Sequence, residues 1–535
     1  MLSVLLILPA QGLEEVYDEQ GIALIAAFLR EHGYKVTLEV IRNIDELKLI
    51  KLFNVDIVGI TAYHENLPFV FQISKEIKYF DKDILICLGG YSATYYAEEI
   101  LDSCDEIDII IEREGERTFL ELCQKIEYKE SYENQKGIYY REENGKTIYT
   151  GLNHIVEDLS EMPYSAKDIF EKNHMHLVEI STSRGCLNNC SFCYSHTYFD
   201  PTGNMRWRGR SVDNVFQEIV NVDRKYKVNK FYFNNASFED SFPYKAFMIN
   251  LCKRLIENKI EISFCVNFRV GFCKRCTEEE MILLKRAGLT GIFIGVEAFN
   301  ESDLSLYNKH TNVNDNLHAI KFFQKFDIGL DIGFINFNPY STYNSLYENM
   351  CCLYQTGLLG SMIFLNRLRG YKGTPIYKKI EEDGLLINNN FLDYYCYRYI
   401  HKPVGELAGL LNSLFVDEYR TIPGSMHYFS MYHNQLVSHL RRVYRDNQII
   451  SNLLLDYDRK RQELLMESND FCMTWYGEML NLLQNNWNIT DAEKIVLGNK
   501  VCEKMLVIEK KMRALYFGFT RQLITKDKQA VSYLK

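Results

Sequence analysis

The fold and the chemistry of this chain depend on one segment, Ser183-Arg-Gly-Cys186-Leu-Asn-Asn-Cys190-Ser-Phe-Cys193-Tyr-Ser-His196. Its three cysteines have C-x3-C-x2-C spacing and follow a strand-like run at 176–180. Thiolates are soft ligands that select iron–sulfur clusters, zinc or copper, and electron-transfer cubane clusters are held by four cysteines. A loop with only three sulfurs leaves one metal position vacant, as catalytic zinc sites do. The vacancy indicates that a substrate or cofactor binds the metal.

The motif Cys186-x3-Cys190-x2-Cys193, with the aromatic Phe192 before the third cysteine, resembles the signature of the radical S-adenosylmethionine (SAM) enzymes. The resemblance implies that the cysteines hold a 4Fe-4S cluster. It further implies that the open iron chelates the amino and carboxylate groups of SAM. In that family one electron from the cluster cleaves SAM to a 5′-deoxyadenosyl radical, and the resemblance places Phe192 in the cofactor site. The alternative is a zinc-binding interaction protein with a Cys3His knuckle that uses His196.

Length and composition limit the remaining possibilities. The chain has 535 residues, which predicts two to four domains. Its hydrophobic content of 47% and aromatic content of 13% are typical of a globular protein. The formal net charge of −10 argues against general nucleic-acid binding.

Targeting signals and cysteine usage bear on the compartment. The apolar start at 1–9 lacks a basic region and leads into acidic residues, so it is interpreted as a strand, not a signal peptide. No apolar run reaches the roughly 18 residues that a membrane-spanning helix needs. Fifteen cysteines without a secretory signal favour a reducing compartment. We therefore expect a cytoplasmic protein that does not associate with membranes.

Residues 1–130 alternate strand-like and helix-like patterns. A helix is expected at 21–32, and strands are expected at 3–8, 35–40, 56–61, 84–88 and 108–111. Alternation of this kind predicts an α/β fold with a doubly wound, Rossmann-like parallel sheet. Such sheets bind ligands beyond the carboxyl ends of their strands.

Turn residues at those strand ends resemble the cobalamin-binding domain that precedes a radical SAM barrel. Glycines permit close backbone approach to a large ligand, and two hydroxyl groups can bond its amides. The resemblance implies that cobalamin is bound by Tyr63, Gly89, Gly90, Tyr91, Ser92, Thr94, Gly115 and Glu116.

One family feature is missing from this region. The Asp-x-His-x-x-Gly motif, whose histidine ligates cobalt in other cobalamin proteins, is absent, and His32 and His64 are interpreted as surface or packing residues. The resemblance then implies cobalamin without a lower histidine ligand. The alternative is a Rossmann-like domain that kept its fold and lost its cofactor.

The chain continues with a linker and a second βα series. Residues 131–175 are expected to form the linker, with a small hairpin around Glu143-Asn-Gly145. Residues 176–376 are expected to form a partial (β/α)6 TIM-like radical SAM barrel. Its strands are placed at 176–180, 230–233, 262–266, 291–295, 329–334 and 362–365.

In barrels of this kind function lies on the loops at the carboxyl ends of the strands. Polar residues follow four of the expected strands in chain order. Arg269 suits a carboxylate by bidentate pairing, and Gly295-Val-Glu297 matches a Gly-Ile-Glu of the family that binds ribose hydroxyls or the methionine ammonium. The resemblance implies that SAM is bound by Asn235, Ser237, Arg269, Glu297 and Asn336.

Residues 377–535 are expected to form a C-terminal α-helical domain. Helical patterns cover 432–444, 450–466, 476–484 and 492–524. His401, His427 and His433 lie in or beside an aromatic-rich stretch, where they either pack or line the substrate site. Cys273-x2-Cys276 lacks a partner pair at zinc spacing, so both are interpreted as ordinary thiols.

These features predict a cobalamin-dependent radical SAM enzyme that modifies an unactivated carbon. Methyl transfer in natural-product or peptide biosynthesis is the leading interpretation, on a small-molecule or peptide substrate. The reductant is expected to be a flavodoxin or ferredoxin. Two alternatives remain: rearrangement, ring contraction or oxidation without methyl transfer, and a radical SAM enzyme whose front domain does not bind cobalamin. A methylthiotransferase is disfavoured because the front domain has no extra cysteine triad.

Overall fold

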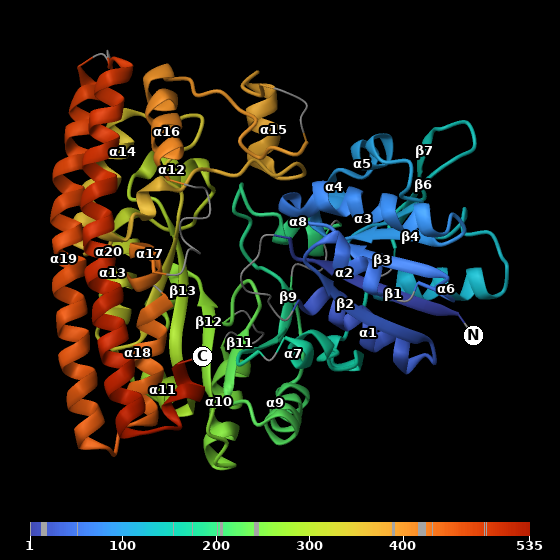
Figure 1. Ribbon diagram of the computed structural model, residues 1–535, viewed down its shortest axis with the longest axis horizontal. Helices are drawn as coiled ribbons and strands as arrows, with labels where there is room; N and C mark the ends of the chain where they lie inside the picture. Colours follow the sequence, from blue (N-terminus) through green and yellow to red (C-terminus); the bar gives the residue numbers. More distant parts are fainter. Residues whose placement is uncertain are drawn as a thin grey trace. The chain divides into compact units, whose positions relative to one another are not determined.

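The structure is a computed structural model that describes residues 2–11, 19–50, 52–153, 155–173, 175–200, 202–203, 207–239, 245–387, 391–415, 424–430, 432–485, 487 and 489–534. The chain forms two compact units (Figure 1). Unit 1 comprises Met1–Asn188, Tyr194–Ala236 and Asn389–Tyr394. Unit 2 comprises Asn189–Cys193, Ser237–Asn388 and Tyr395–Lys535.

Unit 1 is built on a seven-stranded sheet of order β2-β1-β3-β4-β5-β6-β7. The predicted strands are confirmed as β1 (Ser3–Pro9), β2 (Lys35–Ile41), β3 (Ile57–Thr61), β4 (Leu85–Gly89) and β5 (Ile109–Ile111), which pair in parallel. The expected hairpin is β6 (Ile138–Arg141) and β7 (Thr147–Tyr149). It joins the sheet antiparallel to β5, so this part of the linker extends the front sheet.

Helices cover both faces of this sheet, as the near-continuous apolar strands require. Side chains of β1, β3 and β4 form one core with α2 (Ile44–Leu49), α3 (Leu67–Phe80) and α5 (Ala97–Ser103). The alternate side chains form a second core with α1 (Gln20–Glu31) and α6 (Glu116–Glu127). The carboxyl ends of β3, β4 and β5 therefore lie side by side at one edge of the sheet.

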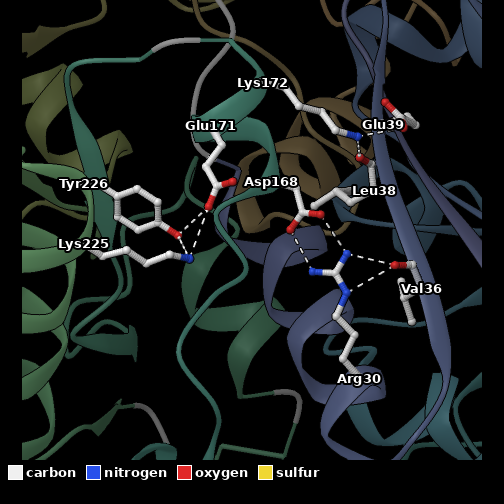
Figure 2. A network of polar contacts seen from close by, with 9 residues as sticks. All are labelled: Arg30, Val36, Leu38, Glu39, Asp168, Glu171, Lys172, Lys225 and Tyr226. Atoms are coloured by element: carbon white, nitrogen blue, oxygen red, sulfur yellow. Dashed lines mark hydrogen bonds and ion pairs between the residues drawn. The ribbon is translucent and has the colours of Figure 1, made fainter.

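The linker helix α7 (Asp168–Lys172) is fixed to unit 1 by charged contacts (Figure 2). Arg30 donates to both carboxylate oxygens of Asp168 at 2.8 Å. Lys172 reaches Glu39 at 2.7 Å, and Glu171 pairs with Lys225 of α9 (Val212–Tyr226) at 3.3 Å. Five of these residues line a cavity of about 440 Å³: Arg30, Asp168, Glu171, Lys172 and Lys225. Each of their charged groups is paired with another of the five or, for Lys172, with Glu39.

Four further short strands belong to unit 1. The predicted first and second barrel strands are confirmed as β8 (Val178–Ile180) and β11 (Lys230–Phe233), which pair in parallel. β9 (Ser183–Gly185) pairs antiparallel with β10 (Trp207–Gly209), with Arg184 opposite Arg208. This two-stranded pairing was not predicted. β9 leads into the segment that contains the three cysteines, and β10 follows that segment in the chain.

Unit 2 contains three parallel strands, β12 (Ser263–Phe268), β13 (Leu289–Glu297) and β14 (Gly329–Phe334). They confirm the expected third, fourth and fifth barrel strands. The helices that accompany these strands in the chain are α10 (Ala246–Glu257), α11 (Glu278–Ala287), α12 (Glu301–Leu306), α13 (Val313–Gln324) and α14 (Tyr343–Gln355). The α/β assignment with a front Rossmann-like domain, a central radical SAM barrel and a helical C-terminal region is confirmed.

The predicted sixth strand at 362–365 is wrong. This segment forms the 3-10 helices η4 (Leu359–Ser361) and η5 (Ile363–Leu365), with Met362 between them at φ 64°. The physical reason is tertiary packing. A Cβ on Gly360 would lie 2.5 Å from the backbone nitrogen of Asn469, so the turn presses against a C-terminal helix. What remains of strand pairing here is one isolated parallel bridge, Phe337 to Arg367.

Helix α18 (Tyr432–Val443) packs against β13 and β14 near the amino-terminal ends of these strands. Gly291 and Gly329 make this approach possible, because a Cβ on either would lie 2.7 Å and 2.6 Å from atoms of Gln435. The Cys265 thiol also lies 3.3 Å from the Gln435 side-chain oxygen. The helical region therefore closes one end of this strand layer.

Replacing Gly329 with alanine should destabilise unit 2 by about 1–3 kcal/mol. The new methyl would collide with helix backbone, which cannot rotate away as a side chain can, and overpacking of this kind has that typical cost. Thermal unfolding measures the effect. Gly477→Ala is the matched control, because nothing lies within 4 Å of its Cβ position in a helix and alanine favours helices. Equal melting temperatures for the two variants would contradict the packing account.

Two long helices dominate the C-terminal region, α19 (Gln448–Gln484) and α20 (Asp491–Lys526), and they lie side by side (Figure 1). The two helices predicted at 450–466 and 476–484 are one continuous helix, because no breaker residue separates them. The shorter helices are α15 (Pro375–Glu382), α16 (Lys402–Leu414), α17 (Met426–Ser430) and α21 (Ala530–Leu534). None of the described helices is both long and apolar enough to cross a lipid bilayer.

The packing interpretation of His433 is confirmed. Its ring is buried, and its Nε2 lies 2.6 Å from the Tyr457 hydroxyl. Burial, followed by the nearby Arg461 charge, lowers the pKa of His433 to about 3, so the ring is neutral at pH 7. Arg461 is itself buried and donates to the carbonyl of Phe429 at 2.8 Å. This polar network lies inside the helical region and has a structural role.

Candidate active site

The three motif cysteines differ from most of the other thiols in exposure. None of the fifteen cysteines, all of which the structure describes, forms a disulfide. Cys186, Cys190 and Cys193 are partly exposed, whereas most of the rest are buried. Among the described residues no three His, Cys, Asp or Glu side chains are gathered as a metal site. The donor set itself fits an iron–sulfur cluster, because three free soft thiols occur within eight residues of chain.

The middle of the cysteine segment, residues 189–193, is fixed within unit 2. The Ser191 amide donates to the carbonyl of Tyr307 at 2.9 Å, and its hydroxyl donates to Leu306 at 2.7 Å. The ring of Phe192 meets Tyr307 edge to face, with 5.5 Å between centroids. His310 lies 3.0 Å from the Asn189 side-chain oxygen. The segment after β13 therefore holds this part of the cysteine loop.

A charged pair lies within electrostatic range of Cys190. Burial is the main cause that raises the pKa of the Cys190 thiol, Lys309 opposes it and Glu297 adds to it. Lys309 and Glu297 are themselves paired, with 3.6 Å between the ammonium nitrogen and a carboxylate oxygen. Both side chains are nearly inaccessible to solvent. Unit 2 thus brings a predicted site residue, Glu297, together with a lysine that sequence reasoning missed.

The Glu297 carboxylate lies next to two strand glycines, Gly295 of β13 and Gly333 of β14. A Cβ on Gly295 would be 2.6 Å from its Oε1, and a Cβ on Gly333 would be 3.2 Å from both carboxylate oxygens. Glu297 has φ 66°, in the left-handed region that is uncommon for residues other than glycine. Strain at a residue with a buried charge is typical of functional sites.

Arg269 follows β12, as predicted, and it pairs with a carboxylate of unit 2 itself. Its Nε lies 3.1 Å from Oε1 of Glu239, and its backbone amide donates to the same oxygen at 3.2 Å. Glu239 also accepts a hydrogen bond from Ser237, and both of these side chains are buried. Ser237, Glu239 and Arg269 form one polar cluster at the end of β12.

The other two residues proposed for SAM are buried. Asn336 is saturated within unit 2, because its amide donates to the Phe364 carbonyl at 2.8 Å and the Tyr476 hydroxyl at 2.9 Å. Its oxygen accepts from Asn349 at 3.1 Å. These contacts favour a positioning role for Asn336. Asn235 is buried in unit 1, just after β11.

The turns predicted to bind cobalamin lie at one edge of the front sheet. Gly90 has φ +105°, and a Cβ there would lie 2.8 Å from the Ala62 carbonyl, so the turn requires glycine. Next to it, nothing lies within 4 Å of a Cβ on Gly89, which leaves the backbone approachable. Tyr63 donates to Glu19 at 2.7 Å, and burial followed by that carboxylate raises the pKa of the Tyr63 hydroxyl. The backbone at Gly89 is therefore open to the approach of a ligand.

Two of the predicted cobalamin contacts have protein partners. The Thr94 hydroxyl accepts the Arg113 amide at 2.8 Å, and the buried Glu116 carboxylate pairs with Arg184. Ser92 is also buried, and Gly115 lies at the start of α6, where a Cβ would be 3.2 Å from Ile111.

Glu114 completes a buried charge cluster with these residues. It pairs with both Arg184 and Arg208, which face each other across the β9–β10 hairpin. Burial raises the pKa of Glu114, but the charges of Arg184 and Arg208 outweigh it and the net pKa is lowered. Four buried groups, Glu114, Glu116, Arg184 and Arg208, therefore compensate one another. We refer to them as the charge quartet.

The chain after Cys193 also contacts the front turns. The Tyr91 ring lies 4.0 Å from the Tyr194 ring and 4.3 Å from the Tyr198 ring, by centroids. Arg113 donates to the carbonyl of Tyr198 at 2.9 Å and also to that of Thr197, in the short helix α8 (Ser195–Phe199). Tyr198 returns a bond to the Arg113 carbonyl at 2.6 Å.

The remaining sequence interpretations concern isolated side chains. His64 is buried and stacks on Tyr394 with 4.1 Å between centroids, which agrees with a packing residue, and His32 is exposed, which agrees with a surface residue. Cys273 and Cys276 are buried thiols, and burial raises the pKa of Cys276 to about 12. The sequence motifs did not identify three residues that the structure places at the candidate site: Lys309, Arg113 and Arg184. Of these three, only Arg184 could have been suspected from the sequence, because it lies two residues before Cys186.

Comparison with known proteins identifies two domains. Residues 13–123 match the B12 binding domain family, and residues 180–335 match the radical SAM superfamily. These ranges contain the front turns and the cysteine segment described above. The predicted order of the two domains is confirmed.

Similar curated proteins carry several activities in their names. An uncharacterized methyltransferase of Pyrococcus horikoshii is 26% identical over 58% of this chain and 67% of its own length. The anaerobic magnesium-protoporphyrin IX monomethyl ester cyclase of Rubrivivax gelatinosus is 27% identical over 59% of this chain and 58% of its own length. The match therefore spans about three fifths of this chain and leaves a third or more of each relative unmatched.

A solved structure resembles the fold over nearly the whole chain. The cobalamin-dependent S-adenosylmethionine radical enzyme OxsB has a TM-score of 0.69 and 18% identity. The match covers 99% of this chain and 81% of OxsB. The likeness extends to the C-terminal helices, beyond the two matched domains.

Proposed function

From the B12-binding and radical SAM domains of this chain, which are those of the cobalamin-binding radical SAM enzymes, we propose that it modifies an unactivated carbon atom. Methyl transfer is the leading reaction. One observation carries the proposal. Three free thiols at C-x3-C-x2-C spacing lie inside a matched radical SAM domain that follows a matched B12-binding domain.

We assign the 4Fe-4S cluster to Cys186, Cys190 and Cys193, because three thiolates leave one iron for SAM. When bound, the cluster and SAM supply a 5′-deoxyadenosyl radical, and cobalamin supplies the methyl group. The protein must hold the substrate in place and exclude water. Phe192 contributes apolar surface beside the loop, where its ring is already fixed against Tyr307.

We assign the methionine end of SAM to the pair Glu297 and Lys309. A carboxylate and an ammonium group that are both buried complement the ammonium and carboxylate of an amino acid. Arg269 is assigned to the same cofactor with Ser237, although its carboxylate partner within unit 2 is Glu239.

We assign cobalamin to the edge formed by the turns after β3, β4 and β5, with Tyr63, Gly89, Gly90 and Tyr91 in contact. The open approach at Gly89 supports this assignment. Thr94 and Glu116 shape the edge through their bonds to Arg113 and Arg184.

Reaction without methyl transfer is the second candidate. The name of the Rubrivivax gelatinosus relative is that of a cyclase, whereas the Pyrococcus horikoshii relative is named a methyltransferase. Both candidates use a small-molecule or peptide substrate and an external one-electron reductant such as flavodoxin or ferredoxin. Fifteen free cysteines support a reducing, cytoplasmic location for either.

Anaerobic reconstitution with iron, sulfide, hydroxocobalamin and isotope-labelled SAM tests the proposal. We expect bound corrin absorbance, the absorbance of a 4Fe-4S cluster, and both 5′-deoxyadenosine and S-adenosylhomocysteine as products. Appearance of 5′-deoxyadenosine alone would select the second candidate. A protein that binds no iron and cleaves no SAM would reject both.

A further inference from the structure

Both ends of the cysteine segment are bonded to turns of the front sheet within unit 1. At the entry, Arg184 lies two residues before Cys186 and pairs with Glu114 and Glu116. At the exit, Arg113 donates to two carbonyls of α8, which begins two residues after Cys193. Arg113 and Glu114 belong to the turn after β5, and Glu116 is the first residue of α6, which follows that turn.

The entry contact is electrostatic. Arg184 and Arg208 stand opposite each other in the hairpin, and two buried like charges repel unless anions lie between them. Their side chains are 11% and 3% exposed, so solvent screens them little. Glu114 bridges both guanidinium groups and Glu116 holds Arg184, which fixes the hairpin to the turn.

The exit contact consists of hydrogen bonds from an arginine to backbone carbonyls, not of ion pairs. The Arg113 amide donates to the Thr94 hydroxyl, in the short helix α4 (Tyr91–Tyr95) that follows β4, and the Arg113 side chain donates to the carbonyls of Thr197 and Tyr198. Arg113 has φ 59°, a left-handed backbone conformation that such surrounding bonds must hold in place. Tyr91, the first residue of α4, adds contacts between its ring and the rings of Tyr194 and Tyr198.

We propose that Arg184 and Arg113 are positioning residues that couple cobalamin binding at the front turns to retention of the cluster by the cysteine segment. The inference rests on the proposed function, because it takes those turns as the cobalamin edge. A ligand that orders the turns after β4 and β5 also orders the entry and exit of the cysteine segment. By linkage, the cluster must then favour cobalamin by the same factor.

The test measures the dissociation constant of hydroxocobalamin by equilibrium titration, for protein with its cluster and for the same protein after chelation of the iron. Allosteric factors of about 5–150 are typical, and we expect the cluster-loaded form to bind at least about fivefold more tightly. Arg184→Lys keeps the charge but cannot bridge two carboxylates, so it should bring the ratio of constants toward one. Arg113→Lys alone should also bring the ratio of the two hydroxocobalamin dissociation constants closer to one.

Arg210→Lys is the matched control. Arg210 also forms a buried ion pair in unit 1, with Glu218 at 2.6 Å, but it contacts neither front turn in any described bond. Its ratio should equal that of the wild type. An equal loss in Arg210→Lys would reduce the effect to general destabilisation and overturn the inference.

The other outcomes separate the inference from the proposed function. If the wild type binds both cofactors with a ratio of one, the coupling is rejected and the proposed function stands. If neither form binds hydroxocobalamin, the cobalamin assignment and the inference both fail. Cluster loss to a chelator, followed by absorbance with and without cobalamin, gives a second readout that does not depend on turnover.

Discussion

Cys190→Ala should abolish formation of 5′-deoxyadenosine from SAM, with a loss of at least about a thousand-fold, or about 4 kcal/mol of transition-state free energy. Removal of one of three thiolates leaves the cluster without a full ligand set, and no nearby thiol is placed to replace it within the described cysteine segment. The measurement is iron content, cluster absorbance and 5′-deoxyadenosine after anaerobic reconstitution.

Two control variants sharpen this prediction. Cys502→Ala removes an exposed thiol in α20 and should leave iron content unchanged. His196→Ala distinguishes the metals, because a Cys3His zinc site would lose its fourth ligand whereas a three-cysteine cluster would not. Retained SAM cleavage in Cys190→Ala would refute the cluster assignment. Zinc binding that depends on His196 would favour the interaction-protein alternative.

Glu114→Gln should destabilise unit 1 by about 3–5 kcal/mol, the usual cost of removing one partner from a buried ion pair. Glutamine has nearly the same shape but no charge, so Arg184 and Arg208 would face each other with Glu116 as their remaining compensation. Thermal unfolding, or hydrogen exchange of unit 1, measures the loss.

The control is Glu463→Gln, which removes an exposed partner of Arg459 on α19 and should change stability by less than about 1 kcal/mol. The effect of Glu114 also depends on pH. Its folded pKa lies below the ordinary value of 4.5, so its stabilisation is complete at neutral pH and is lost as pH falls below 4.5. A difference between wild type and variant that persists unchanged at pH 3 would contradict the ionised quartet.

The sequence predicted the strands of both sheets well, because continuous apolar runs such as 3–8 and 329–334 fit buried parallel strands. The prediction of a strand at 362–365 was wrong, because an apolar run can also be buried in a helical turn. Its apolar residues are buried by η4 and η5 against α19, and an apolar run of four residues looks the same in either setting.

For the site, the sequence identified residues whose spacing carries chemistry. The cysteines and Glu297 come from motifs, and Gly90 comes from a turn whose backbone excludes any side chain. Lys309 and Arg113 could not be found in this way. A single lysine or arginine has no pattern, and its role depends on a partner that lies elsewhere in the chain, Glu297 for the one and the α8 carbonyls for the other.

The sequence by itself determined the chemistry, because ligand type and spacing within eight residues define a three-thiolate site. It also determined the order of the two α/β domains. Only the tertiary structure decided which charges are buried together, since Glu114 and Arg208 are separated by 94 positions and meet only in the folded unit. Burial gives those charges their energetic weight, and burial is a property of the fold, not of any local stretch of residues.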